Sequence, residues 1–200
     1  FTPEIEMDLC GHATLATAYC LNSILNYPDK SIKFETKSGD ISVDYKDGKY
    51  HMDFPSRVPV KSDLPKLISK SLNLKPSEIY KSRDFLLIYN SEKEIKKIKI
   101  NTRYFNKINL DPGGVVVTAK GTSSDFVSRY FTPQSTILED PATGSSHCSL
   151  IPFWSKRLNK THLTSIQLSK RIGEFECINH SKRVTVIGSA VNYSKTTITI

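Results

Sequence analysis

The sequence contains the same strand–turn–helix unit twice, and this repeat constrains the fold more than any other feature. The tripeptide Phe-Thr-Pro at Phe1–Pro3 recurs at Phe131–Pro133, and the same offset places Cys10 opposite Asp140. In both copies an apolar strand leads into a turn that carries a reactive side chain, and small residues then begin a helix. The repeat predicts a chain built from two similar halves.

The two turns, Asp8–Thr14 and Glu139–Cys148, have the chemistry of anion-binding helix starts. The first turn of a helix exposes unpaired backbone N–H groups and the positive end of the helix dipole. Gly11 and Gly144 allow the backbone to approach a ligand closely. Two such helix starts that face each other would hold one small anion and address both faces of its reacting carbon. That geometry suits isomerisation, epimerisation or racemisation by proton transfer without a cofactor.

Hydrophobic periodicity predicts short antiparallel strands with a few helices, hence an α+β fold rather than a dinucleotide-binding α/β fold. Alternation predicts a strand over residues 4–9, and the uncharged segment 15–25 predicts a helix buried on nearly every side. Asp47-Gly48 predicts a tight hairpin turn. Ser91 with Glu94 predicts a capped helix start. A helix is also expected over 146–158, where Pro152 should kink or shorten it.

The segment 55–65 is rich in proline, serine and charge, which is typical of a connector between domains. We therefore place a domain boundary there. Residues 1–57 are expected to form the remainder of an N-terminal domain, and residues 58–200 a C-terminal domain that repeats the strand–turn–helix unit.

Composition narrows the class of protein. The formal net charge is +8, but the lysines carry no interleaved aromatic residues and no nucleic-acid-binding signature. A lysine-rich solvated face is preferred to a nucleic-acid-associated protein, which stays as a third hypothesis. No segment has the length and apolarity of a membrane span. The four cysteines form no metal-binding or disulfide pattern, so free thiols, no metal and a cytoplasmic location are expected.

The paired turns resemble those of the PhzF-like family of phenazine-biosynthesis-type isomerases, relatives of diaminopimelate epimerase and proline racemase. The resemblance covers nearly the whole chain. It implies an α+β fold of two pseudo-symmetric domains, each with antiparallel strands wrapped round a central helix, and an active site in the cleft between them. It also implies a homodimer and cofactor-independent proton-shift chemistry on a small carboxylic acid.

The resemblance assigns site residues one by one. His12 and Asp140 match the active-site histidine and aspartate of the family, and Ser145 matches a serine that contacts the substrate. The residues whose backbone N–H groups are expected to hold the carboxylate are Gly11, Thr143 and Gly144. Cys10 lies where the epimerase and racemase relatives keep a catalytic cysteine, on which PhzF-like proteins do not depend.

Each assigned residue also has a structural alternative. His12 could cap its helix or bond within the core, Asp140 could be an N-capping residue, and Cys10 could be a small buried apolar residue. Members of the family carry a further N-terminal segment with a glutamate that serves as the main acid/base, and no residue of this chain matches it. A carboxylate-binding protein without catalysis on the same scaffold is therefore the alternative to an isomerase.

Overall fold

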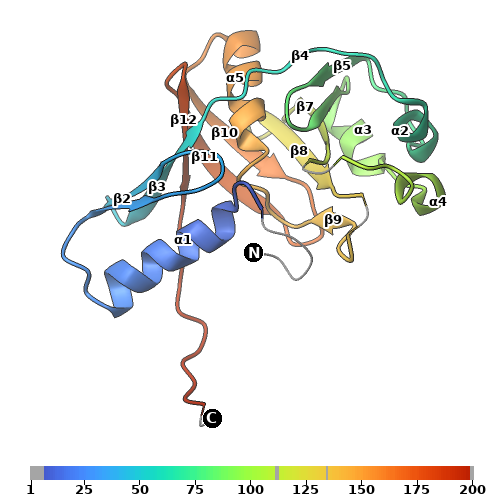
Figure 1. The fold of residues 1–200 in the computed structure, drawn as a ribbon. Coiled ribbons are helices and arrows are strands. Elements are labelled where there is room, and N and C mark those ends of the chain that lie inside the picture. Colours follow the sequence, from blue (N-terminus) through green and yellow to red (C-terminus); the bar gives the residue numbers. More distant parts are fainter. Residues whose placement is uncertain (1–6, 111–112, 134, 199–200) are drawn as a thin grey trace.

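The computed structural model describes residues 7–110, 113–133 and 135–198, which form an α+β fold with a large, mostly antiparallel sheet (Figure 1). The helices are α1 (Gly11–Tyr19), its π-helical continuation η1 (Cys20–Ile24), α2 (Lys66–Ser71), α3 (Glu92–Lys97), α4 (Thr102–Phe105) and α5 (His147–Leu158). The strands are β1 (Ser31–Phe34), β2 (Ile41–Lys46), β3 (Lys49–Pro55), β4 (Val60–Lys61), β5 (Glu78–Lys81), β6 (Phe85–Ile88), β7 (Val115–Lys120), β8 (Phe126–Phe131), β9 (Glu139–Asp140), β10 (His162–Gln167), β11 (Gly173–Asn179) and β12 (Arg183–Gly188). No helix in these three ranges has the length and apolarity needed to cross a membrane.

The sheet joins the early and the late parts of the chain. Its strand order is β1-β2-β3-β12-β11-β10-β8-β7-β6-β5-β4, with β9 beside β8. The pairs β8–β10 and β6–β7 are parallel, and the other pairs are antiparallel. Strand β12 lies between β3 and β11, so the last strand attaches the N-terminal hairpin to the rest of the sheet.

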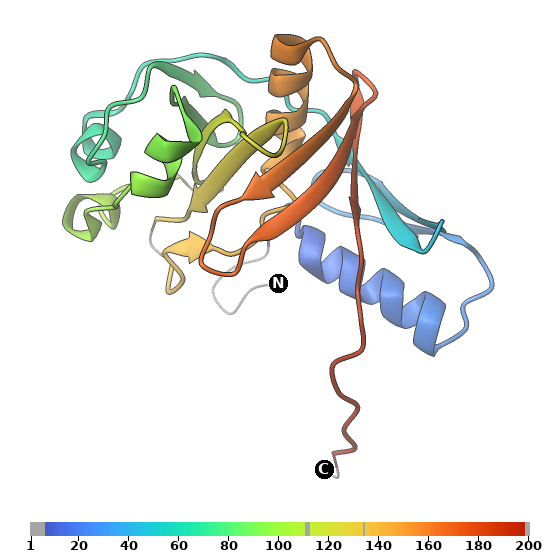
Figure 2. The same cartoon turned by 180° about the vertical axis from the view of Figure 1, so that it is seen from behind.

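Two hydrophobic clusters fill the interior. One gathers side chains of α1, α5, β1–β3 and β12 and includes Leu9, Phe54, Leu150 and Val184. The other lies beneath α2, α3 and α4 and includes Ile68, Ile95, Phe105 and Val117. Figure 2 shows α5 beside the strands β10–β12 and α1 on the opposite side of the molecule from α2–α4. The domain boundary near residue 57 stays a prediction.

Helix α5 runs through Pro152 as a continuous helix of 12 residues, so the predicted shortening at this proline is wrong. A proline has no N–H to donate to the carbonyl group one turn earlier, here that of Cys148. The Arg57 N–H donates to this carbonyl oxygen instead, at 2.8 Å. The connector after β3 therefore replaces the hydrogen bond that Pro152 removes.

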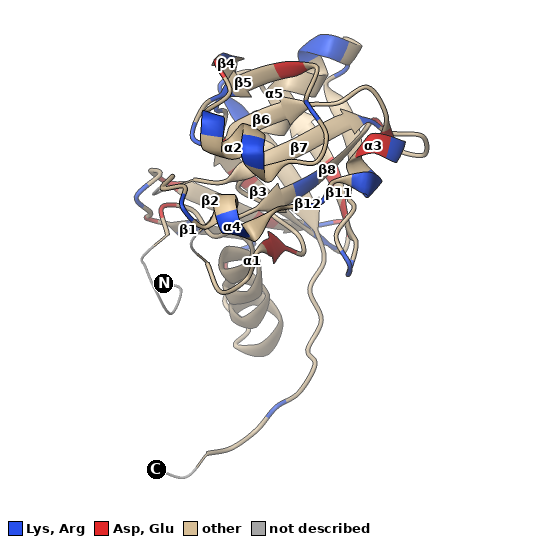
Figure 3. Cartoon of the chain, turned by 90° about the vertical axis from the view of Figure 1, so that its right-hand side faces the viewer, with Lys and Arg blue, Asp and Glu red and all other residues tan. Residues whose placement is uncertain are grey.

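The prediction that the first helix is buried on nearly every side is also wrong. Only Gly11, Thr14 and Ala18 of α1 are buried, because β2 and β3 cover one face of the helix. Ile24 and Leu25, at its far end, are exposed. Figure 3 shows no lysine, arginine, aspartate or glutamate on α1, which agrees with the uncharged sequence of residues 11–25.

Two local predictions are confirmed. Asp47 and Gly48 form the turn between β2 and β3 with positive φ angles of 53° and 77°, which the hairpin's right-handed twist favours. Ser91 caps α3 by accepting the Glu94 N–H at 3.3 Å, and the Glu94 carboxylate accepts the Asn90 N–H at 2.8 Å.

The predicted first strand of the repeat falls partly outside the described residues. Phe1–Pro3 and the first part of the predicted strand 4–9 lie outside them, and residues 7–10 are irregular rather than extended into a strand. Beyond β12, residues 189–198 extend away from the sheet without forming a strand. The repeated unit is therefore observed at its turns and helices, not at its first strand.

Gly114 immediately precedes β7 and lies where no side chain fits. A Cβ atom there would lie 2.5 Å from the Cζ of Tyr130 and 2.8 Å from the carbonyl oxygen of Phe131. We expect Gly114→Ala to lower the free energy of unfolding by about 1–3 kcal/mol, measured by urea denaturation, because it overpacks this contact. Gly188→Ala is the matched control, because its Cβ would meet Leu15 at an ordinary 3.6 Å. Equal stabilities of the two variants would contradict the prediction.

Candidate active site

The first turn leads into α1, and among the described residues no acidic side chain bonds to the backbone N–H groups at the start of this helix. Cys10 is the N-cap in an extended conformation, and its side chain makes no capping hydrogen bond. The N–H and the hydroxyl group of Thr14 both donate to the Cys10 carbonyl oxygen, at 3.1 and 2.9 Å. His12 and Cys10 are exposed, so neither is the buried core residue of the structural alternatives. The first turn of α1 contains no acidic residue, which leaves the positive end of its dipole available to an anion.

The second turn runs from β9 to α5 and is held by Gln167, a fully buried side chain at the end of β10. The Gln167 amide donates to the Asp140 carbonyl oxygen at 2.6 Å and accepts the Thr143 N–H at 2.8 Å. The Thr143 hydroxyl donates to the Asp140 carboxylate at 2.6 Å. The Thr143 N–H therefore bonds to Gln167, whereas the sequence predicted that it would hold the substrate carboxylate. Thr143 instead acts on the site through its hydroxyl group, which bonds to Asp140.

Sequence reasoning missed Gln167, although the pattern of β10 contains a signal. Leu163, Ser165 and Gln167 alternate on the buried face of this strand. A buried glutamine needs hydrogen-bond partners for both ends of its amide. A strand that places such a residue inward therefore indicates a polar segment packed against it, which here is the Asp140–Thr143 turn.

The two turns meet at their glycines. A Cβ atom on Gly11 would lie 3.3 Å from the Gly144 Cα, and one on Gly144 would lie 3.4 Å from the Gly11 Cα. Phe54 of β3 packs beneath both, at 3.6 and 3.7 Å from these positions. Side chains at either position would separate the two backbones. The structure thus brings the two helix starts together, with Ser145 buried next to Gly144.

The electrostatics of the meeting point favour a bound anion. Neither α1 nor α5 has an acidic residue in its first turn. Asp140, half-buried on β9, is the carboxylate that the second turn contributes. It accepts a hydrogen bond from Thr143 and does not cap α5, whose N-cap is Ser146. A carboxylate positioned in this way is suited to accept a proton from a bound acid.

His147 lies close in sequence to the second turn but belongs to the core. It is fully buried, with Nδ1 2.9 Å from the Thr143 carbonyl oxygen and Nε2 2.8 Å from the Ser165 hydroxyl. A carbonyl oxygen only accepts, so the ring proton is on Nδ1 and Nε2 accepts from Ser165. Burial lowers the pKa of His147 to about 4, which keeps the ring neutral at physiological pH.

This histidine makes stability depend on pH. The ordinary pKa of 6.5 applies in the unfolded chain, so between pH 6.5 and about 4 the unfolded chain binds a proton that the native protein does not. The free energy of unfolding should fall with decreasing pH across this window, by up to about 1.4 kcal/mol per pH unit. Urea denaturation at about pH 7, 6 and 5 measures the slope. His147→Gln should flatten the dependence of the free energy of unfolding on pH, and the control His162→Gln, at an exposed position, should leave it unchanged. Equal slopes in the wild-type protein and both variants would show that His147 does not cause the pH dependence.

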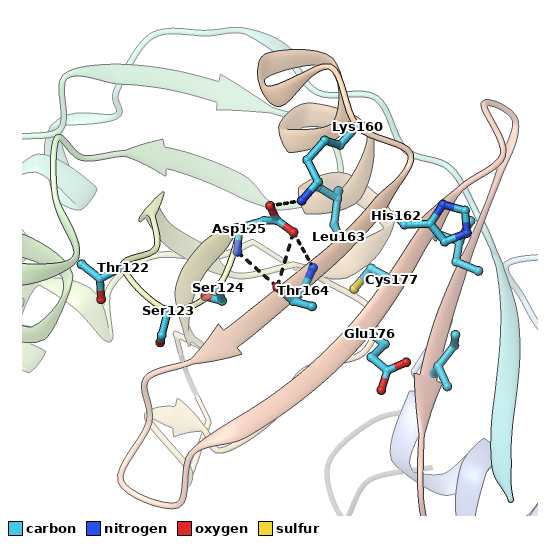
Figure 4. A pocket seen from close by; sticks show the side chains of 12 residues that line it. Thr122, Ser123, Ser124, Asp125, Lys160, His162, Leu163, Thr164, Glu176 and Cys177 are labelled. Atoms are coloured by element: carbon cyan, nitrogen blue, oxygen red, sulfur yellow. Dashed lines mark hydrogen bonds and ion pairs between the residues drawn. The ribbon is translucent and has the colours of Figure 1, made fainter. Parts of the chain in front are cut away.

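A hollow of about 520 Å³ lies elsewhere on the protein, at the start of β10 and thus at the opposite end of that strand from Gln167 (Figure 4). Asp125 and Lys160 form an ion pair in it, and Asp125 also accepts the Thr164 N–H at 2.8 Å. None of the predicted site residues line it. Among the described residues, no group of three His, Cys, Asp or Glu side chains could hold a metal ion.

Comparison with known proteins identifies the family. The family model for phenazine biosynthesis-like proteins, PhzC-PhzF, matches residues 1–196. The chain belongs to this family. An uncharacterized isomerase of Pseudomonas aeruginosa is 40% identical over 192 residues, which are 96% of this chain and 73% of that protein. A mouse phenazine biosynthesis-like domain-containing protein is 32% identical and matches 100% of this chain and 76% of its own length.

Solved structures of the family have the same fold. A phenazine biosynthesis PhzC/PhzF protein from Clostridium difficile superposes with a TM-score of 0.88 at 42% identity and covers 100% of this chain and 77% of that one. A PhzF family protein from Enterococcus faecalis gives 0.87 at 40% identity, over 97% and 74% of the two chains. A protein described as a probable proline racemase from Agrobacterium radiobacter, 12% identical with a TM-score of 0.56 over 93% and 65%, shares the fold alone.

Proposed function

We propose that the protein is a cofactor-independent isomerase that moves a proton on a small carboxylic acid held between the starts of α1 and α5. The observation that carries the proposal is the contact between Gly11 and Gly144, which joins two helix starts without acidic first-turn residues. The names of the bacterial relatives as isomerases support the same reaction class.

Each residue of the site has a role in this proposal. The backbone of Gly11 and Gly144 holds the substrate carboxylate, and Ser145 contacts the substrate. Asp140 accepts or returns a proton, oriented by the Thr143 hydroxyl that bonds to it. His12 is the second proton-transfer group on the opposite turn. Cys10, exposed at the N-cap of α1, is a further residue for testing.

The proposal extends to the organisation of the protein. The two halves would form pseudo-symmetric domains divided near residue 57, each with strands around a central helix, as in diaminopimelate epimerase-like folds. We expect a cytoplasmic homodimer whose partner molecule is the carboxylate substrate, with no bound nucleic acid, membrane, metal or cofactor.

Solvent-deuterium exchange on a panel of acids tests the function and does not require that the substrate be identified first. Small hydroxy and amino acids are incubated with the protein in D₂O, and ¹H NMR follows loss of the proton next to the carboxylate. Protein-dependent exchange in at least one acid is expected. Binding of these acids without exchange would identify the catalytically inactive carboxylate-binding protein, and absence of both would overturn the proposed site.

A further inference from the structure

A cluster of charged and polar side chains connects the two turns of the proposed site. It contains Asp8, Arg57, Arg83, Asp84 and Tyr130, which come from four separate segments of the chain. The side chains of Arg83 and Asp84 are only 7% and 2% exposed. Buried charges cost desolvation energy, and a buried ion pair is often no more stabilising than apolar residues of the same size. The presence of this cluster is therefore weak evidence for a role in stability.

Asp8 ties the cluster to the first turn, two residues before the N-cap of α1. Its carboxylate forms ion pairs with Arg57 and Arg83, each at 2.8 Å, and accepts the Ser38 hydroxyl at 3.1 Å. Burial acts to raise the pKa of Asp8, but the two guanidinium groups outweigh it and hold the pKa below the ordinary value. Asp8 is therefore ionised at neutral pH, and both arginines hold the first turn.

Arg57 also reaches the helix that follows the second turn. Its backbone N–H donates to the Cys148 carbonyl oxygen at 2.8 Å, in the first turn of α5. This acceptor is available because Pro152 cannot donate to it. One residue thus bonds to α5 through its backbone and to Asp8 through its side chain.

Arg83 reaches the second turn by another route. Its guanidinium group lies 3.3 Å from the Asp84 carboxylate, which accepts the Tyr130 hydroxyl at 3.1 Å and the Gly114 N–H at 2.8 Å. Tyr130 lies in β8, where it is paired with Asp140 of β9. A continuous series of contacts therefore runs from Asp8 in the first turn to Asp140 in the second.

We propose that Arg57 and Arg83 are positioning residues, which hold Asp8 and thereby fix the first turn against the second so that both bind one carboxylate together. This inference rests on the proposed function, because it concerns the same site. It assigns to Asp8 a role in ligand binding without contact to the ligand.

Acetate serves as the probe, titrated at constant ionic strength while ¹H–¹⁵N NMR follows the amides of Gly11 and Gly144. The test variants are Asp8→Asn, which keeps the shape of the side chain, and Arg57→Lys, which keeps the charge and the backbone N–H. The matched controls are Asp53→Asn, which breaks the ion pair with Arg183, and Arg157→Lys, which alters the pair with Glu78. Neither control pair includes a residue of the two turns.

In the wild-type protein both amides should shift with one dissociation constant. Asp8→Asn and Arg57→Lys should raise that constant at least about tenfold, within the usual range of coupling between sites, and the controls should stay within about twofold. The double variant with both Asp8→Asn and Arg57→Lys should lose no more acetate affinity than the weaker-binding single variant, because the two residues act as one unit. A purely structural role would lower the urea midpoint and leave the dissociation constant of the folded protein unchanged.

Unchanged acetate affinity in folded Asp8→Asn would overturn the inference and leave the proposed function intact. The failure of the proposed function has different signatures. If the carboxylate site itself is wrong, acetate shifts neither amide in the wild-type protein; if only the isomerase activity is wrong, acetate shifts both amides but no acid of the panel exchanges its proton.

Discussion

Asp140→Ala is expected to reduce solvent-deuterium exchange by about 10²–10⁴-fold, the usual contribution of a positioned acid or base. The variant should remain folded, because Gln167 holds the turn through the main-chain oxygen of residue 140 and the N–H of Thr143. The lost contact is one hydrogen bond from the Thr143 hydroxyl, worth about 1 kcal/mol. Initial exchange rates measured by ¹H NMR on the most responsive acid of the panel give the effect.

Two comparisons make this result specific. Asp44→Ala removes an exposed carboxylate from β2, and this variant should catalyse deuterium exchange of the acid at the wild-type rate. Acetate should still shift the Gly11 and Gly144 amides in Asp140→Ala, because the backbone groups of the helix starts remain. An exchange rate within about threefold of wild type would remove Asp140 from the proposed mechanism.

Phe54→Ala should cause the largest loss of stability, about 3–5 kcal/mol in the free energy of unfolding. Phe54 is fully buried in β3 and supports both glycines of the site. The truncation leaves a cavity beneath the contact between the turns, so acetate affinity should fall in the protein that remains folded. Urea denaturation followed by circular dichroism measures the stability.

Leu25→Ala is the control for this substitution, because Leu25 is 68% exposed and its truncation removes little buried surface. It should change the free energy of unfolding by less than about 0.5 kcal/mol. A loss below about 1 kcal/mol in Phe54→Ala would show that the structure collapses around the missing ring and that the glycines do not need this support.

Local patterns predicted the parts of the fold that depend on neighbouring residues. The turn at Asp47-Gly48 follows from the conformations these residues tolerate, and the cap at Ser91 follows from the spacing to Glu94. The meeting of the two turns at Gly11 and Gly144 also agrees with the prediction from the repeat, because the small residues that mark each helix start allow the close approach.

The errors arose where a distant segment decides the outcome. Nothing in the sequence around Pro152 indicates that Arg57 will supply the missing hydrogen bond. The hydrogen bond from Gln167 to the Asp140 carbonyl oxygen and the ion pairs of Asp8 likewise join residues that are distant in the sequence. The uncharged sequence of the first helix predicted burial on nearly every side, but the described strands cover one face of it. Pattern alone does not say how many elements pack around a helix.

The place of β12 in the sheet has a consequence for synthesis of the chain. Asp53 of β3 pairs with Thr185 of β12, so β3 obtains this neighbour only after the long segment between the two strands has left the ribosome. Until then the β3 edge has unpaired backbone groups, which can pair with other strands. Contacts between residues so distant in sequence also slow folding. A nascent chain of this protein is therefore most exposed to mispairing, and most in need of a chaperone, while the segment between β3 and β12 is being made.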